Sequence, residues 1–474
     1  MSSSAVEDAR EKKSVRRRLR ELIWDSLDRS PEERRFISKI DFYILSWAGL
    51  AYFSKNLNQN NVEPRPANAY ISGMKEELNV VGNEYQTFTT MWTISRLRSS
   101  APEIIEARLL TCTKADVFTQ VRISIWCPSW ELLWVLVTFT TAAVHNSQHL
   151  YACRFFVVGT QNTVHQVPTM PHLNPSNPVC LTELGKRACI FFASAFIGSM
   201  FSGYLQAALY SGMNGVGGLS GWRWLFIFDG IITLPMALWA YYALPDLPSN
   251  TRVRWLSPEE KQLALDHMKR AGKQLDEPFT LAGLRRILGK WHFWVYTAYY
   301  TFFICSENIG TYMNLWLKSL NRYTIPQINN FPTATNAITI VTTLTYGWVS
   351  DGLQIRAPIV YFSLTVCFFA AMNLAIWDGV PFGLKWASFY MTGQTMVNEY
   401  CAGDSLERKF ILGTTNSIAY AFNAWIALVT YNTNYAPRFL VGNSVTAGLI
   451  ICAATTLTAA VFLQRRDDRV DDWE

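Results

Sequence analysis

The sequence predicts an all-α integral membrane protein with about a dozen transmembrane helices, arranged as two groups of six. Half of the 474 residues are hydrophobic and only 16% are charged, against about 25% in a typical soluble domain. The charges are concentrated in a few segments. Between them lie apolar stretches that approach or exceed the roughly 20 residues needed to cross a bilayer, and a polar segment, residues 245–290, divides these stretches six and six.

The apolar stretches lie between a polar tail, residues 1–39, and a short second tail, residues 464–474. In the first half the expected spans are 40–58, a second starting at 84, 125–144, a fourth starting at 150, 188–210 and 222–244. In the second half they are 291–317, 328–350, 357–377, 384–397, 411–431 and 440–463. The second, fourth and tenth spans are truncated: the second is apolar only to about Ile94, the fourth only to Gly159, and the tenth is about ten residues short.

Lysine and arginine are concentrated in alternate connections between the expected spans. The connection from the second to the third span, the central segment and both tails contain lysine or arginine, whereas the connections after the third and fifth spans contain neither residue. Because basic loops stay in the cytoplasm, this pattern predicts an even number of spans with both tails inside. The run from Arg16 to Arg20 is either a solvated part of the tail or a contact with anionic lipid.

Twelve spans divided by a basic loop are typical of a secondary transporter, in which two helical bundles rock about a central site. A nucleic-acid partner is not expected, since the basic residues flank apolar spans. The nine cysteines form no CxxC pair, and no His or Cys cluster has the spacing of a metal site. We therefore expect no metal, no cofactor and no enzymatic activity, and no segment resembles the selectivity filter of a channel.

Two short motifs resemble those of the major facilitator superfamily. Gly347 and Asp351, followed by Arg356, lie between the eighth and ninth spans and match its G-x-x-x-D-x(4–5)-R loop. Glycine would allow close helix approach there, and the two charges could pair with neighbouring groups; an ordinary charged turn is the alternative. Arg154 and Gly159 in the fourth span match the R-x-x-x-x-G motif. An arginine within a span faces a cavity or an acid, or else extends to the interface.

Longer segments give a more particular resemblance, to the fungal allantoate/pantothenate permease family of anion:cation symporters. The segments are residues 217–230, 244–248, 255–260, 381–386 and 398–408, and the resemblance covers most of 38–95, 122–159 and 183–463. It implies a major facilitator fold with two six-helix bundles, residues 40–244 and 291–463, joined by a cytoplasmic loop. It also implies a monomeric plasma-membrane protein that imports a small organic anion, such as pantothenate or allantoate, by proton symport.

Polar residues within apolar spans are the candidates for an anion site, because such a site needs buried positive charge or hydrogen-bond donors. Lys55 in the first span is expected to attract the substrate carboxylate, unless it extends to the outer interface. Glu307 and Asn308 in the seventh span would line the site. Gln206 and Asn423 are further candidates, with helix–helix hydrogen bonding as their alternative role.

Proton coupling requires a titratable carboxyl group, and two acids of related chains are missing here. Relatives usually carry an acid where this sequence has Asn58, and another where it has Thr160-Gln161-Asn162. Glu307, Glu131 in the third span and Glu399 near the tenth are the remaining carriers. Asp229 is expected to pair with Arg223 or to cap its helix locally.

Residues 96–121 and 160–182 are polar, proline-rich or charged where relatives continue the second and fourth spans. Unsatisfied backbone in lipid costs several kcal/mol per group, so such breaks are expensive. One hypothesis is that both segments are intron-derived or mis-spliced sequence, and the rival is a divergent transporter with short or re-entrant spans. The alternative function is then a non-transporting or defective membrane protein of the same fold, translated from a mis-spliced gene.

Overall fold

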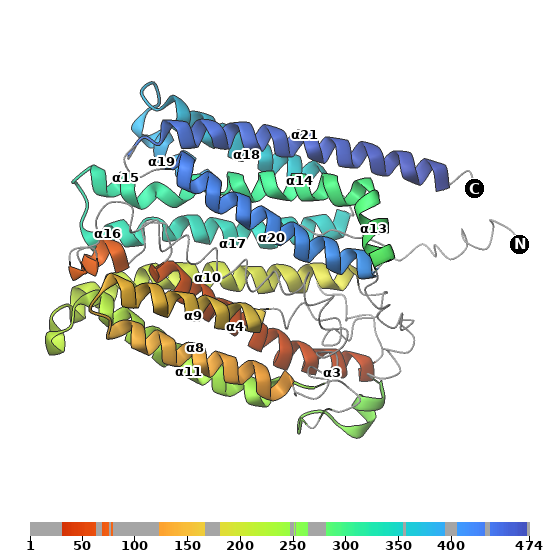
Figure 1. Ribbon diagram of the computed structural model, residues 1–474, viewed down its shortest axis with the longest axis horizontal. Coiled ribbons are helices and arrows are strands. Elements are labelled where there is room, and N and C mark those ends of the chain that lie inside the picture. The colour runs from red at the N-terminus through yellow and green to blue at the C-terminus, as the bar shows by residue number, and fades with distance from the viewer. Residues whose placement is uncertain are drawn as a thin grey trace, which may run out of the picture.

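Long helices occupy most of the apolar stretches in the computed structural model (Figure 1). The structure describes residues 31–62, 69–74, 77–78, 123–165, 181–246, 251, 253–263, 281–353, 357–393, 405–431 and 437–471. Within these residues, four helices are long and apolar enough to cross a membrane: Cys189–Met213, Gly221–Ala243, Ala357–Ile376 and Leu440–Asp467. The second expected span lies outside the described residues, so its truncation stays a prediction.

The helices of the first half begin with one nearly continuous rod. It consists of α3 (Pro31–Ile40), a π-helical turn η2 (Asp41–Leu45) and α4 (Ser46–Val62). The other elements are η3 (Tyr70–Met74), α8 (Ile123–Ala142), α9 (Ser147–His165), α10 (Leu181–Met213), η6 (Val216–Gly218) and α11 (Gly221–Ala243). The third, fifth and sixth spans thus form where hydropathy predicts them.

The second half contains shorter pieces as well as full-length helices. Its elements are α13 (Leu281–Gly289), α14 (Trp291–Ser306), η7 (Ile309–Tyr312), α15 (Met313–Ser319), α16 (Ile325–Asn330), α17 (Thr333–Leu353), α18 (Ala357–Ile376), α19 (Phe382–Met391), α20 (Ser405–Thr430) and α21 (Leu440–Asp471). Pro332 separates α16 from α17, since proline removes a backbone donor and clashes with the preceding turn.

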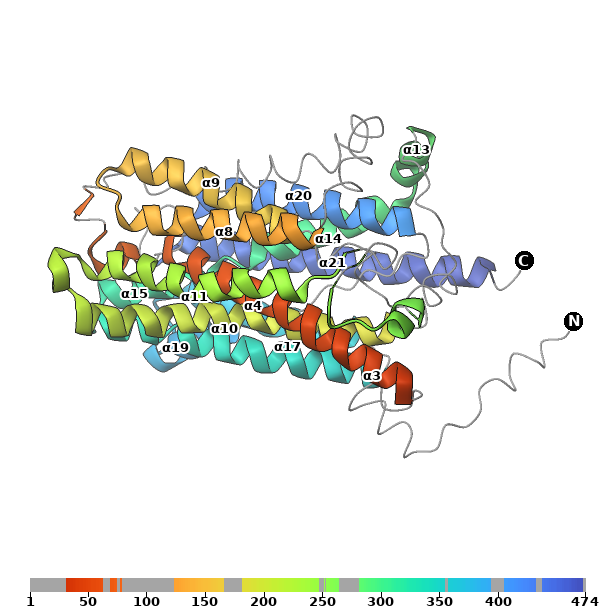
Figure 2. The same ribbon diagram turned by 90° about the horizontal axis from the view of Figure 1, so that it is seen from below.

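Each half packs mainly with itself. In the first half α4 contacts α10 and α11, and α8 contacts α9 and α11; in the second half α14 contacts α20 and α21, and α18 contacts α19 and α21. The halves meet where α10 packs along α17 and against α16, and both views place α10 beside α17 (Figures 1 and 2). The start of α3 and the end of α21 lie at the same end of the bundle, which is what an even number of spans requires.

Two glycines allow the two halves to approach closely. A Cβ atom at Gly203 of α10 would overlap the carbonyl oxygen of Asn329 and the side chain of Thr333. At the other end of the same contact, a Cβ at Gly347 of α17 would overlap the sulfur of Cys189. Small residues are what helix contacts in membranes use for close packing.

The fourth span is longer than its hydropathy predicts. Helix α9 continues through Thr160, Gln161 and Asn162 to His165, which gives 19 residues and a length of about 28 Å. The helix therefore continues past Gly159, the residue at which its apolar stretch ends. Threonine, glutamine and asparagine cost only fractions of a kcal/mol each in a helix, and no proline intervenes before Pro168.

The tenth span, α19, is short and is held by an aromatic cluster. It has ten residues, about 15 Å, and residues 394–404 lie outside the described part of the chain. Phe389 of α19 stacks on Trp316 with ring centroids 5.0 Å apart, and Trp386 packs edge-on against Phe331 at 5.2 Å. Aromatic pairs of this kind add about 0.5–1.5 kcal/mol beyond area burial, which helps to fix a helix too short to cross the bilayer.

Candidate functional site

Lys55 lies on α4 and is buried. Its side chain is 8% exposed, so it does not extend to an outer interface, and its Nζ lies 5.7 Å from the ring centroid of Tyr52 on the preceding turn. The neighbouring Ser54 is 1% exposed. A buried ammonium group is costly within a membrane and usually serves a function.

The outer half of α4 is joined to three other helices by buried asparagines. Asn58 donates to Thr138 of α8 at 3.3 Å, Ser202 of α10 donates to Asn61 Oδ1 at 2.6 Å, and Asn61 donates in turn to the carboxylate of Asp229 on α11. Sequence reasoning missed this node of Asn61, Ser202 and Asp229. The run Asn58-Gln59-Asn60-Asn61 inside a span was the available signal.

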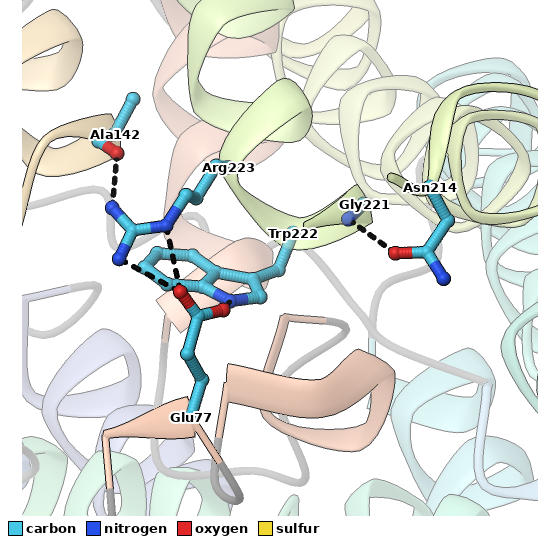
Figure 3. Close-up of polar contacts among 6 residues, drawn as sticks. All are labelled: Glu77, Ala142, Asn214, Gly221, Trp222 and Arg223. Atoms are coloured by element: carbon cyan, nitrogen blue, oxygen red, sulfur yellow. Dashed lines mark hydrogen bonds and ion pairs between the residues drawn. The ribbon is translucent and has the colours of Figure 1, made fainter. Parts of the chain in front are cut away.

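Asp229 does not pair with Arg223, contrary to expectation. The two residues are six positions apart, which places them on different faces of one helix. Asp229 instead accepts from Asn61, while Arg223 extends to Glu77 in the segment after α4, with an Nη2-to-Oε1 distance of 2.9 Å (Figure 3). Arg223 also donates to the carbonyl of Ala142 at 2.7 Å, at the end of α8.

Glu77 receives three donors. Its Oε2 accepts from the Trp222 indole at 2.6 Å, and its Oε1 accepts from Arg223 Nε at 3.0 Å. Burial by itself raises the pKa of the Glu77 carboxyl, but the hydrogen bonds from Trp222 and Arg223 and the charge of Arg223 outweigh burial and lower the pKa. The carboxylate is therefore ionised. Through Arg223 it connects its own segment to the start of α11 and the end of α8.

Glu131 on α8 is 2% exposed and lies in largely apolar surroundings. Trp47 of α4 and Cys127 of α8 belong to the buried cluster beside it. Neither Glu131 Oε1 nor Trp47 Nε1 has a hydrogen-bond partner among the described residues. A buried carboxyl group inside a membrane span is a candidate functional residue.

The seventh span is interrupted at two of the predicted site residues. Helix α14 ends at Ser306, and the exposed Glu307 and buried Asn308 form a turn before η7. Asn308 Nδ2 donates to the Cys305 carbonyl at 3.0 Å, which satisfies a backbone group freed by the break, and to Asn423 Oδ1 at 2.5 Å. The structure thus brings Asn308 and Asn423 together.

The contact between α14 and α20 continues as a polar seam that sequence reasoning missed. Tyr300 donates to Asn416 at 3.3 Å, and the hydroxyls of Thr297 and Thr415 lie 3.0 Å apart. Tyrosine and threonine are common in apolar helices, so only helical phase could have marked these positions.

Gln206 on α10 is fully buried, and neither side-chain polar atom has a hydrogen-bond partner among the described residues. It lies one turn after Ser202, on the face directed toward α4. Gln206 therefore hydrogen-bonds neither Lys55 nor Glu307.

The gating candidates are only partly described. Arg154 and Gly159 lie in α9 and Asp351 lies in α17, but their side-chain surroundings are outside the described part, as are Arg356 and Glu399 altogether. Gly347 packs against Cys189. Among the described residues no group of three or more His, Cys, Asp or Glu side chains could hold a metal ion.

Comparison with known proteins decides the family. The model of the Major Facilitator Superfamily matches residues 129–429. The chain belongs to the major facilitator superfamily. Relatives of this superfamily member include the pantothenate transporter liz1 of Schizosaccharomyces pombe, which is 30% identical over 92% of this chain and 84% of its own length. The pantothenate transporter FEN2 of Saccharomyces cerevisiae is 28% identical over 90% of this chain and 84% of its own.

These relatives place the chain in the fungal pantothenate permease family, so it is a multi-pass membrane transport protein and not an enzyme. Solved structures agree on the fold. The chain superposes on the outward-facing transporter FucP with a TM-score of 0.54 at 11% identity, over 87% of this chain and 97% of that one. For a tetrameric PepTSo2 the TM-score is 0.57 at 13% identity, over 91% and 99%. The expected all-α major facilitator fold is confirmed.

Proposed function

We propose that this transporter imports a small organic carboxylate, of the pantothenate type or the allantoate type, by proton symport across the plasma membrane, and that it acts as a monomer. Residues 40–244 and 291–463 would be the two bundles, with the cytoplasmic segment 245–290 between them. The similarity to two pantothenate transporters supports the pantothenate type of substrate. A third relative, the vitamin H transporter of Saccharomyces cerevisiae, is 26% identical over 87% of this chain and 70% of its own.

Buried Lys55 is the observation that carries the anion assignment. The residue is buried, and an ionisable side chain inside a membrane span is a candidate for a substrate or ion pathway. A substrate carboxylate would be attracted to it there. Glu307, Asn308 and Asn423 at the break in the seventh span would contact the rest of the substrate, and Gln206 would supply a further amide.

Glu131 is the strongest candidate for the coupling proton. It is buried beside Trp47, where a carboxyl group can hold a proton and release it when the bundles move and water enters. Glu399 and Glu307 are the other candidates. Arg154, Gly159, Gly347, Asp351 and Arg356 would take part in gating.

Uptake of labelled pantothenate, allantoate and nicotinate in a transport-deficient yeast tests the proposal. We expect uptake of at least one, stimulated by an inward pH gradient. Lys55→Ala should raise the half-saturation constant about tenfold or more, as loss of a hydrogen bond to a charged group implies. Lys318→Ala is the matched control, because Lys318 is exposed at the end of α15. Unchanged half-saturation in Lys55→Ala would remove that residue from the site.

A separate measurement tests Glu131. Glu131→Gln should lose uptake driven by a pH gradient and keep exchange of labelled for unlabelled substrate, because exchange requires no net proton release. Normal pH-driven uptake by this variant would assign coupling to another acid.

The second candidate function is a non-transporting protein of the same fold, and the ten-residue α19 is the observation that favours it. If none of the three substrates enters while the protein reaches the cell surface, this alternative holds. Sequencing the transcript over residues 96–121 and 160–182 tests its origin, since a major mRNA that encodes both segments would exclude mis-splicing.

A further inference from the structure

The two halves touch at the end of the bundle where α16 lies, opposite the start of α3 and the end of α21 (Figure 1). By the distribution of basic residues this is the outer end. There α16 of the second half packs against α10 of the first half, and Ser72 of η3, also in the first half, contacts the same short helix. A transporter with alternating access has to separate its halves at this end before a substrate can enter from outside.

Asn329 of α16 lies where these three segments meet. Its Nδ2 donates to Ser72 Oγ at 3.4 Å, across 257 positions of sequence, and both residues are 2% exposed. Its carbonyl oxygen lies so close to Gly203 of α10 that a Cβ atom there would be only 2.8 Å away. One residue of the second half therefore contacts two segments of the first. We call Ser72, Gly203 and Asn329 the outer contact.

Local sequence features hold Ser72 and Asn329 in place. Gly73 has a φ of +107°, which residues with a side chain rarely adopt, and so allows a tight turn directly after Ser72. Helix α16 begins with a capping box in which Gln327 Oε1 accepts from the Thr324 backbone N–H at 3.0 Å. Both partners of the hydrogen bond are thus presented on short turns whose backbone geometry is fixed locally.

The outer contact is tightly packed, but it should cost little to break. Most N–H···O hydrogen bonds measure about 2.7–3.2 Å between the heavy atoms, so the bond from Asn329 to Ser72 is a long one. The side-chain oxygens Oδ1 of Asn329 and Asn330 are buried without a hydrogen-bond partner among the residues that the structure describes. Burial of an unpaired polar atom is unfavourable. Water that enters as the halves part would hydrate both oxygens and so offset part of the lost contact.

We propose that the outer contact is the outer gate of the transport pathway. The Ser72–Asn329 hydrogen bond and the close packing at Gly203 hold the halves together on the outside, and both separate once in each transport cycle. These three residues are distinct from the gating candidates that the sequence motifs indicate. The gate controls access to the pathway, so the inference depends neither on the identity of the substrate nor on proton coupling.

The first experiment measures the separation of the halves in the purified full-length protein in lipid nanodiscs, with reactive native cysteines replaced by serine. Spin labels on Val216→Cys and Arg322→Cys, two exposed positions in outer connections of the first and second half, report the distance by pulsed electron spin resonance. Ser72→Ala/Asn329→Ala should raise the fraction of the long distance about two- to tenfold, as loss of a single hydrogen bond implies.

Gly203→Ala acts on the same contact from the other side. Its Cβ would press against the Asn329 carbonyl, so this variant should also increase the long-distance fraction. Gly212→Ala is the matched control on the same helix, because a Cβ there meets no atom within 4 Å, and it should leave the distribution unchanged. The two tests change different residues, so a folding failure of one variant leaves the other measurable. An unchanged distribution in the folded variants overturns the proposal.

The second experiment locks the outer contact. Ser72→Cys/Asn329→Cys should lose uptake when it is oxidised to a disulfide and regain it on reduction. Thr140→Cys is the matched control: Thr140 Oγ1 lies 3.9 Å from the sulfur of Cys153, so its disulfide joins two helices of the same half and should not affect uptake. Full uptake by the oxidised Ser72→Cys/Asn329→Cys protein, with the disulfide verified by mass spectrometry, overturns the proposal.

Discussion

Arg223 at the start of α11 and Glu77 in the segment after α4 form an ion pair across 146 positions of sequence, with a 2.9 Å contact. The guanidinium is buried, and it also caps α8 through the Ala142 carbonyl (Figure 3). Arg223 therefore joins the segment that contains Glu77, the end of α8 and the start of α11. This contact lies at the end of the bundle opposite α3 and α13.

Replacing Glu77 should destabilise the protein in a pH-dependent way. Because the folded-state pKa of Glu77 is lowered, its contribution is complete above the usual carboxylate pKa and is lost as pH falls through the folded value. We expect Glu77→Gln to lower the unfolding temperature by a few degrees near neutral pH, and the difference from the unchanged protein to shrink toward about pH 4. Glu259→Gln, an exposed acid of the central segment, is the control; a constant difference across this pH range would contradict the ion pair.

The buried hydrogen bonds of Asn61 should contribute more to stability than those of its neighbour Asn60. Asn61→Ala leaves Ser202 and Asp229 without that partner, and an unsatisfied buried polar group costs about 1–3 kcal/mol. Asn60→Ala removes a contact with Ser199 that is only partly buried, so it should cost less. The comparison is made by thermal unfolding of both variants in one detergent. Equal losses of stability would contradict a larger contribution from Asn61.

Gly347→Ala should disturb the contact between the two halves. Its new Cβ would overlap Cys189, and overpacking costs about 1–3 kcal/mol. Cys189→Ala removes the overlapping sulfur, so the double variant should recover most of the lost stability and surface expression. Absence of recovery would indicate that the glycine is needed for a reason other than this contact.

Asn308 and Asn423 should act as a unit. In a double-mutant cycle of Asn308→Ala and Asn423→Ala, we expect an interaction energy of about 0.5–3 kcal/mol, as for residues in direct contact. Unfolding free energies and half-saturation constants for uptake can both be entered in the cycle. Strict additivity in both quantities would mean that the 2.5 Å contact is not energetically significant.

Apolar composition predicts α8, α11, α18 and the start of α21 to within a few residues, because membrane spans are selected by length and hydropathy alone. It does not predict the break at Glu307–Asn308, where the surrounding residues are as apolar as in an unbroken helix. The partners of Arg223 and Asp229 were also out of reach. Because Arg223 and Asp229 are close in sequence, we expected them to pair with each other. In the structure each has a partner more than 140 residues away.

The polar segment after α11 is fastened to the base of the first helix. Trp255 stacks on Tyr43 with ring centroids 4.3 Å apart, and Glu260 pairs with Lys39 at 2.6 Å. Residues 253–260 are therefore held against the first helix of the first half. Of the 46 residues between the sixth and seventh expected spans, those up to Glu260 are thus tied to the first half, and a shorter part is left to connect it to the second.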